Sequence, residues 1–114
     1  MEAEKLTGFV VKATADCMEK YYKKQRDMRD NLIIKELKPY GINTLNIGEY
    51  ASTGRLTLIE YRDDSCRGAV YNHFYLDGEE IFVIKETYKM TVKNGRYGVK
   101  YRIGVVSRKG EGAK

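Results

Sequence analysis

The chain is poor in the residue types that most often carry catalytic or metal chemistry. Its 114 residues include one histidine, two cysteines, one proline and no tryptophan. Because His73 is the only histidine, it has no histidine partner for a metal site or an acid–base pair. Cys17 and Cys66 form no CxxC motif, and reduced thiols are the default expectation for such isolated cysteines. We therefore predict neither a metal site nor a bound cofactor.

Two further absences bear on location and on enzyme class. No apolar run approaches the roughly 18 residues of a membrane span, and the charged N-terminal residues lack the apolar core of a signal peptide. We accordingly expect a cytoplasmic protein without a membrane partner. Glycine-rich phosphate loops and the GxSxG nucleophile motif are also missing, so the sequence indicates no enzyme class.

What the chain does contain predicts one folded domain. Hydrophobic residues make up 42% of it, the net charge is +5 and the pI is about 9.1. A chain of this length suffices for a single hydrophobic core, and we assign residues 1–107 to that domain. Residues 108–114 contain two glycines and charges of both signs. We expect them to form a disordered tail.

A β-hairpin is the clearest local prediction. Asn94-Gly95 lies between two segments of alternating residues, and this dipeptide is the strongest signal for a two-residue type I′ turn. Both central residues of such a turn need positive φ, which asparagine and glycine tolerate. The turn fixes the register, so that Lys89 is expected opposite Lys100.

All positive charges of this hairpin are expected on one face. Between Ile81 and Arg108 the chain has seven basic residues and one acid, Glu86, whereas the other residues include 14 basic and 15 acidic ones. Like charges directly opposite each other across strands are mildly destabilising, so a face of one sign favours an anionic partner. A solvated polar face is the simpler interpretation, but it explains only the sidedness and not the uniform sign. The predicted binding residues are Lys85, Lys89, Lys93, Arg96, Lys100, Arg102 and Arg108, with Phe74 beside them.

The dipeptide Asp77-Gly78 predicts a second turn of the same type, which places Phe74 opposite Ile81. In this register Phe74 joins the basic side, while His73 and Glu86 point to the other side, toward the core. A core histidine is the ordinary interpretation, and a general base in a cavity, assisted by Glu86, is the functional one. His73 and Glu86 are thus the only candidate catalytic residues.

The remaining periodicities predict an α+β fold. Helical spacing covers most of residues 3–37 and Pro39 is expected to end that helix, although Gly8–Lys12 also fits a short strand. After Pro39 the period changes to two, which predicts five strands, at Thr44–Tyr50, Arg55–Arg62, Ala69–Leu76, Glu79–Lys93 and Arg96–Ser107. The expected architecture is an N-terminal helical segment packed on a five-stranded antiparallel β-meander. It resembles the cystatin-like and nuclear-transport-factor-like folds in architecture only, because no sequence motif links the chain to either.

Three functions are compatible with these features. The first is a non-enzymatic protein whose basic hairpin binds nucleic acid or a nucleoprotein complex through phosphates. The second is a protein-interaction module or inhibitor that docks on an acidic protein surface. The third is an enzyme or ligand binder with a cavity that uses His73. Pairing of an exposed strand edge, Thr44–Tyr50 or Arg96–Ser107, would in addition give a homodimer.

The tyrosine content raises the question of base stacking. The chain has ten tyrosines, and exposed aromatic side chains can stack on unpaired bases. The expected register argues against this mode, since Tyr88, Tyr97 and Tyr101 lie opposite the basic side of the hairpin. Phosphate contact with little sequence discrimination is therefore the expected mode of binding.

Overall fold

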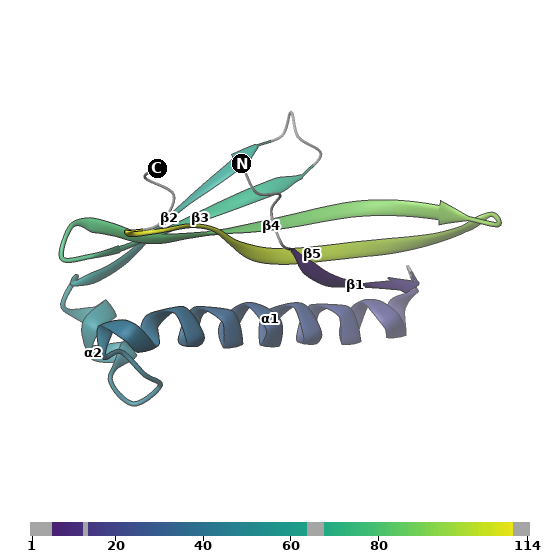
Figure 1. Cartoon of the computed structure of the whole chain (residues 1–114). Helices are drawn as coiled ribbons and strands as arrows, with labels where there is room; N and C mark the ends of the chain where they lie inside the picture. Colours follow the sequence, from purple (N-terminus) through teal and green to yellow (C-terminus); the bar gives the residue numbers. More distant parts are fainter. Residues whose placement is uncertain (1–5, 13, 64–67, 111–114) are drawn as a thin grey trace.

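A computed structural model gives the fold of the chain and describes residues 6–12, 14–63 and 68–110. One long helix lies along one face of a single antiparallel sheet (Figure 1). In chain order the elements are β1 (Thr7–Lys12), α1 (Ala15–Leu37), the short 3₁₀ turn η1 (Lys38–Tyr40), α2 (Ile47–Ser52), β2 (Leu56–Asp63), β3 (Ala69–Leu76), β4 (Glu79–Lys93) and β5 (Arg96–Arg108).

The sheet has the strand order β1-β5-β4-β3-β2. Strands β2 to β5 follow one another as a meander, and β1 pairs with the remaining side of β5. All neighbouring strands are antiparallel. The predicted fold class, an N-terminal helix packed on a five-stranded antiparallel sheet, is therefore confirmed.

Local chemistry explains where α1 begins and ends. The Oγ1 atom of Thr14 accepts a hydrogen bond from the backbone N–H of Cys17 at 3.3 Å and so caps the first turn. At the other end Pro39 enters η1, and Gly41 turns the chain away with a φ of 76°. The predicted end of the helix at Pro39 is confirmed.

The predicted beginning of the helix is wrong, because residues 7–12 form strand β1. Gly8 explains this pairing, since a Cβ atom at that position would lie 1.8 Å from the backbone oxygen of Tyr101 in β5. Only glycine lets the two strands approach so closely. Val10 and Val11 add a β-branched pair that favours an extended backbone. The alternative interpretation of Gly8–Lys12 as a strand is the one confirmed.

The predicted strand at Thr44–Tyr50 is also wrong, because a turn and helix α2 occupy these residues. Asn43 Oδ1 accepts a hydrogen bond from the backbone N–H of Leu45 at 2.8 Å. Asn46 Oδ1 accepts one from the backbone N–H of Asn43 at 2.7 Å. These side-chain oxygens accept hydrogen bonds from backbone N–H groups that would otherwise pair with a neighbouring strand. The local turn therefore prevails over the alternating pattern.

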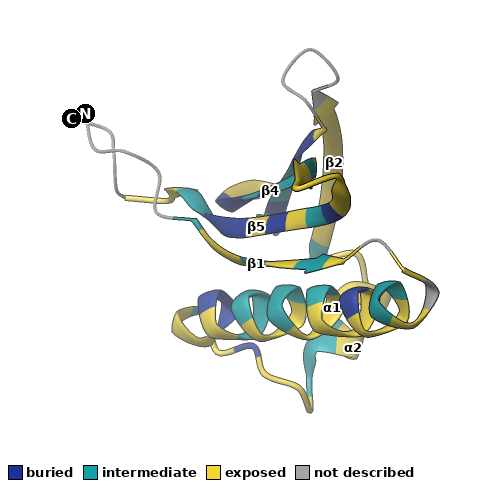
Figure 2. Ribbon diagram, turned by 90° about the vertical axis from the view of Figure 1, so that its right-hand side faces the viewer, coloured by how far each residue is buried: buried dark blue, intermediate teal, exposed yellow. Residues whose placement is uncertain are grey.

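The core lies between α1 and the face of the sheet that α1 covers, which we call the inner face (Figure 2). The largest fully buried side chains are Tyr101, Phe82, Leu37, Ile42, Ile84 and Glu86. As predicted, the helix packs on the side that bears Tyr88 and Val99. The β4–β5 hairpin extends beyond the first turn of α1 (Figure 1). Met90, on this same side of the sheet, is 59% exposed. The opposite side of the sheet is the outer face.

No helix in the described part of the chain combines the length and the apolar character needed to cross a bilayer. The predicted tail begins inside β5, which includes Arg108. Residues 111–114 of that tail lie outside the described residues, as does Cys66.

Candidate functional site

The β4–β5 hairpin has the predicted turn and register. Asn94 and Gly95 have φ values of 53° and 74°, as a type I′ turn requires. Lys89 pairs with Lys100, and the turn itself is flanked by the pair Lys93 and Arg96. These predictions are confirmed, and they determine which side chains of the hairpin point away from α1.

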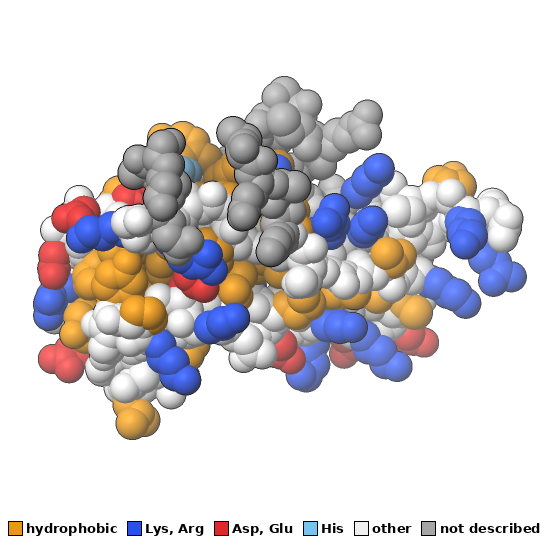
Figure 3. Space-filling model, viewed as in Figure 1, with side chains coloured by type: hydrophobic (Ala, Val, Ile, Leu, Met, Phe, Trp, Pro, Cys, Tyr) orange, Lys and Arg blue, Asp and Glu red, His pale blue; other side chains and the backbone are white. Residues whose placement is uncertain are grey.

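Between Lys85 and Arg102 the outer face of the hairpin carries positive charges and no acid. We call this surface the basic face, and it consists of Lys85, Lys89 and Lys93 on β4 and Arg96, Lys100 and Arg102 on β5. All of these residues except Lys85 are exposed. Lys12 of β1 adjoins them, because it pairs with Gly98 of β5. Figure 3 shows Lys and Arg side chains along the projecting end of the hairpin.

Neighbouring carboxylates do not neutralise four of these cations. Among the residues that the structure describes, Lys89, Lys93, Arg96 and Lys100 form no ion pair with an acid. Lys89 stands directly opposite Lys100, and Lys93 directly opposite Arg96. Such cross-strand pairs of like charge oppose folding slightly. An anionic ligand would remove this repulsion.

Arg108 does not belong to the basic face. Its guanidinium donates two hydrogen bonds to the carboxylate of Glu36 in α1, from Nε to Oε1 at 2.7 Å and from Nη2 to Oε2 at 3.0 Å. A register shift between Val83 and Ile84 moves the end of β5 by one residue, so that Arg108 pairs with Phe82. The predicted position of Arg108 is therefore wrong, and its contact ties β5 to the helix.

The predicted position of Phe74 beside the basic residues is wrong as well. A β-bulge between Phe74 and Tyr75 makes Phe74 pair with Phe82 instead of Ile81. The Phe74 ring stacks on that of Phe82, with 4.6 Å between the centroids, and is buried on the inner face. A shift of one residue has this effect because successive side chains of a strand point to opposite faces.

The same bulge turns two tyrosines toward the basic residues. Tyr71 of β3 pairs with Lys85, whose Nζ atom lies 5.5 Å from the centroid of the Tyr71 ring. Tyr61 of β2 pairs with Tyr71 and is 61% exposed. The register expected from the sequence did not place either tyrosine beside the basic residues. The separation of tyrosines from positive charges thus holds within β4 and β5 and fails for β2 and β3.

His73 also lies on the outer face and not, as predicted, in the core. It pairs with Val83, and its Nδ1 atom lies 2.9 Å from Oε2 of Glu80. The Tyr61 ring stands edge-on to its imidazole, with 5.4 Å between the centroids. Glu86 points to the inner face. The two predicted catalytic residues are therefore on opposite sides of the sheet and cannot act on one substrate together.

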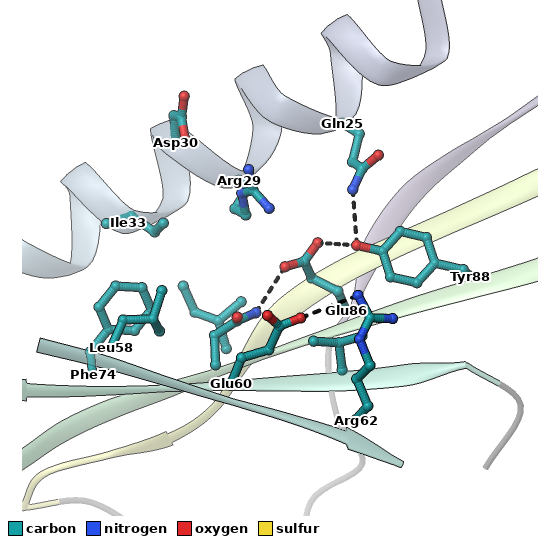
Figure 4. A pocket seen from close by; sticks show the side chains of 13 residues that line it. Gln25, Arg29, Asp30, Ile33, Leu58, Glu60, Arg62, Phe74, Glu86 and Tyr88 are labelled. Carbon is teal, nitrogen blue, oxygen red and sulfur yellow. Dashed lines mark hydrogen bonds and ion pairs between the residues drawn. The ribbon is translucent and has the colours of Figure 1, made fainter. Parts of the chain in front are cut away.

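A cavity of about 470 Å³ lies between α1 and the inner face of the sheet (Figure 4). Its walls combine apolar and charged side chains, namely Gln25, Arg29, Asp30, Ile33, Leu58, Glu60, Arg62, Val70, Asn72, Phe74, Ile84, Glu86 and Tyr88. Arg62 Nη2 lies 3.5 Å from Oε1 of Glu60 at the β2 side of this cavity. The walls carry side chains of both signs, so the cavity does not favour a ligand of one charge.

The carboxylate of Glu86 is held by the protein itself. Its Oε1 atom accepts a hydrogen bond from Asn72 Nδ2 at 2.8 Å. Its Oε2 atom accepts from the hydroxyls of Tyr88 at 2.6 Å and Tyr101 at 2.9 Å, and Gln25 in turn donates to the Tyr88 hydroxyl at 2.9 Å. Three converging donors make Glu86 a structural anchor between strands, and not a free base facing the cavity.

Burial of the tyrosines in this region predicts a loss of stability at alkaline pH. Burial, with the nearby Tyr22 and the negative charge of Glu86, raises the pKa of Tyr21 to about 12. The pKa values of Tyr88 and Tyr101 are also raised above that of an ordinary tyrosine. Burial is the larger cause, and the contact with Glu86 is the second. A tyrosine of the unfolded chain has a pKa near 10, so folding favours the protonated phenol. The stabilisation is complete below that pH and is lost as the pH rises toward the folded-state pKa.

The expected result is a lower urea midpoint at about pH 11 than at about pH 9, with the largest decrease above pH 10. Tyr21→Phe should make this decrease smaller. The substitution removes no hydrogen bond, because the Tyr21 hydroxyl has no partner among the described residues. Circular dichroism at each pH measures the midpoint. An equal midpoint at both values would contradict this account of the buried tyrosines.

The two edges of the sheet are β1 and β2. Neither predicted edge is therefore available for dimer formation through strand pairing. Thr44–Tyr50 is not a strand, and β5 lies between β1 and β4.

Within the described ranges, no three His, Cys, Asp or Glu side chains gather in a group that could hold a metal ion. Comparison with known proteins finds no family model, no curated protein and no solved structure that matches this chain. No match therefore assigns a function to the chain, and the surface that its structure singles out is the basic face.

Proposed function

We propose that this chain is a non-enzymatic nucleic-acid-binding protein, which contacts free nucleic acid or a nucleoprotein complex with its basic face. The observation that carries the proposal is a group of exposed cations on one sheet face, Lys89, Lys93, Arg96 and Lys100, which form no ion pair with an acid among the described residues. Lys and Arg contacts to phosphates supply much of the affinity in such proteins, through the release of counterions. The proposed location is the cytoplasm, where such a ligand is accessible.

The shape of the basic face favours an extended polyanion. Lys85, Lys89 and Lys93 recur every four residues along β4, so they span about 26 Å at about 3.3 Å per residue. The cations of β5 run beside them at the strand spacing of about 4.8 Å. A long strip of one sign complements regularly spaced phosphates, whereas protein surfaces usually intersperse both signs.

Charge reversal at the centre of the strip tests the proposal. The double variant Lys89→Glu/Lys100→Glu is expected to lower the affinity for nucleic acid at least about tenfold at moderate salt. The slope of log K against log salt should become less steep by about 1.4 for a single strand and about 1.8 for a duplex, because each lost phosphate contact contributes about 0.7 or about 0.9. A salt titration followed by fluorescence anisotropy measures both quantities.

The matched control is Lys20→Glu/Lys38→Glu, which makes the same change in net charge at exposed positions of α1 and η1. It should leave the affinity and the salt slope close to those of the wild-type protein. Equal losses in both double variants would point to net charge alone. Purification of a nuclease-resistant protein complex that only the first variant disrupts would favour an acidic protein partner instead.

A further inference from the structure

An aromatic patch adjoins the basic face on the same side of the sheet. Tyr61, Tyr71 and Lys85 follow one another across β2, β3 and β4, because each is the register partner of the next. Thr87, two residues along β4, pairs with Arg102. Two residues of a strand span about 7 Å, so aromatic rings and cations lie within reach of one small ligand segment.

The two rings differ in how they are held. Tyr71 is half-buried, with the Lys85 ammonium 5.5 Å from its ring centroid. Tyr61 is exposed, and it stands against the His73 ring, which Glu80 holds through a contact of 2.9 Å. This support keeps Tyr61 in place at the edge of the sheet without covering it. The arrangement provides an exposed ring that does not have to be ordered when a ligand binds.

We propose that the nucleic acid bound by the basic face is single-stranded, and that its unpaired bases stack on Tyr61 and Tyr71. This inference rests on the proposed function above. In a duplex the bases are stacked on one another and present only their edges, so they cannot cover aromatic rings on a sheet. Unpaired bases can do so, in DNA and RNA alike, with little dependence on sequence. The phosphates of the same strand then contact Lys85, Arg102 and the cations beyond them.

The test compares oligonucleotides of about 12 nucleotides, as single-stranded DNA, single-stranded RNA and duplex DNA of equal length. Fluorescence anisotropy gives the Kd of each for the wild-type protein and for Tyr61→Ala, Tyr71→Ala, Tyr61→Phe and Tyr97→Ala. Single strands of either kind should bind more tightly than the duplex. Tyr61→Ala should weaken single-strand binding by about five- to 150-fold, the range for loss of one stacked base.

The other variants separate stacking from a general effect of substitution. Tyr61→Phe keeps the ring and should retain the wild-type affinity. Tyr97→Ala removes a tyrosine that is as exposed as Tyr61 but lies on the inner face, and it should have no effect. The salt slope of Tyr61→Ala should equal that of the wild-type protein, because no phosphate contact is lost.

Failure of this inference is distinct from failure of the proposed function. If the duplex binds as tightly as the single strands and Tyr61→Ala binds like the wild-type protein, stacking is excluded. The proposed function still holds in that case if Lys89→Glu/Lys100→Glu loses binding. If no oligonucleotide binds, or if the lysine variant binds normally, both proposals are wrong.

Discussion

Replacing Glu86 by alanine is expected to lower the free energy of unfolding by about 2–5 kcal/mol. The carboxylate is 1% exposed and accepts hydrogen bonds from Asn72, Tyr88 and Tyr101. Its removal leaves at least two buried donors, on Asn72 and Tyr101, without an acceptor. Each such donor costs about 1–3 kcal/mol, because it has lost its contact with water without gaining another. Urea denaturation followed by circular dichroism measures the difference.

Two controls identify the cause of this loss. Glu86→Gln keeps the size and one carbonyl acceptor, so it should be clearly less destabilising than Glu86→Ala. Glu49→Ala removes an exposed carboxylate from α2 and should change the stability by no more than about 0.5 kcal/mol. A Glu86→Ala protein as stable as the Glu49→Ala protein would show that the buried network contributes little to the fold.

Replacing Phe82 by alanine is expected to lower the free energy of unfolding by about 3–5 kcal/mol, the usual range for a buried phenylalanine. Phe82 is 1% exposed and stacks on Phe74, with 18° between the ring planes. It also pairs with Arg108, beside the contact that joins β5 to α1. The substitution leaves a cavity where β3, β4 and β5 meet the helix. A domain of ordinary stability, about 5–15 kcal/mol, would lose a large share of it.

Met90→Ala is the matched control for this substitution. Met90 lies on the same strand and the same face as Phe82, but its side chain is 59% exposed. Its replacement should change the free energy of unfolding by no more than about 0.5 kcal/mol. Similar losses in both variants would mean that the inner face of the hairpin is covered along its whole length.

The hairpin could be predicted from the sequence because one dipeptide determines both its turn and its register. Asn94-Gly95 requires a tight turn, and the alternation of charged and apolar residues on both sides agrees with the register that the turn imposes. Six of the eight predicted binding residues consequently lie together on the basic face. The two exceptions, Arg108 and Phe74, both lie beyond a register irregularity.

The orientation of β3 could not be derived from its turn, because the bulge after Phe74 shifts the register that Asp77-Gly78 sets. The pattern within β3 did contain the signal. Val70, Phe74 and Leu76 form its apolar side, which a sheet covered by one helix would turn inward. Giving that pattern precedence over the turn would have placed Tyr71 and His73 on the outer face. The residues of a turn thus predict the register of the two strands only as far as the next β-bulge.

The two misassigned segments have a different cause. Gly8 lowers helix propensity, but its importance comes from the close approach to Tyr101, a residue far away in the sequence. Asn43 and Asn46 act within a few residues, and their turn-forming chemistry was open to prediction. The alternation of Leu45 and Ile47 with polar residues suggested a strand there, yet side-chain hydrogen bonds to the backbone decided the local structure.

The β-bulge between β3 and β4 also restricts how this protein can evolve. β2 pairs with β3 in one continuous register from Leu56–Leu76 to Asp63–Ala69, so any shift of β3 against β4 moves both strands. Loss of the extra residue on β4, Ile81, would exchange their two faces and turn buried side chains to water. Substitutions at exposed positions of β2 and β3 can accumulate one at a time. An insertion or deletion between β3 and β4, by contrast, changes the face on which every side chain of both strands lies. We therefore expect homologous chains to vary in sequence here while conserving the number of residues between Phe74 and Phe82.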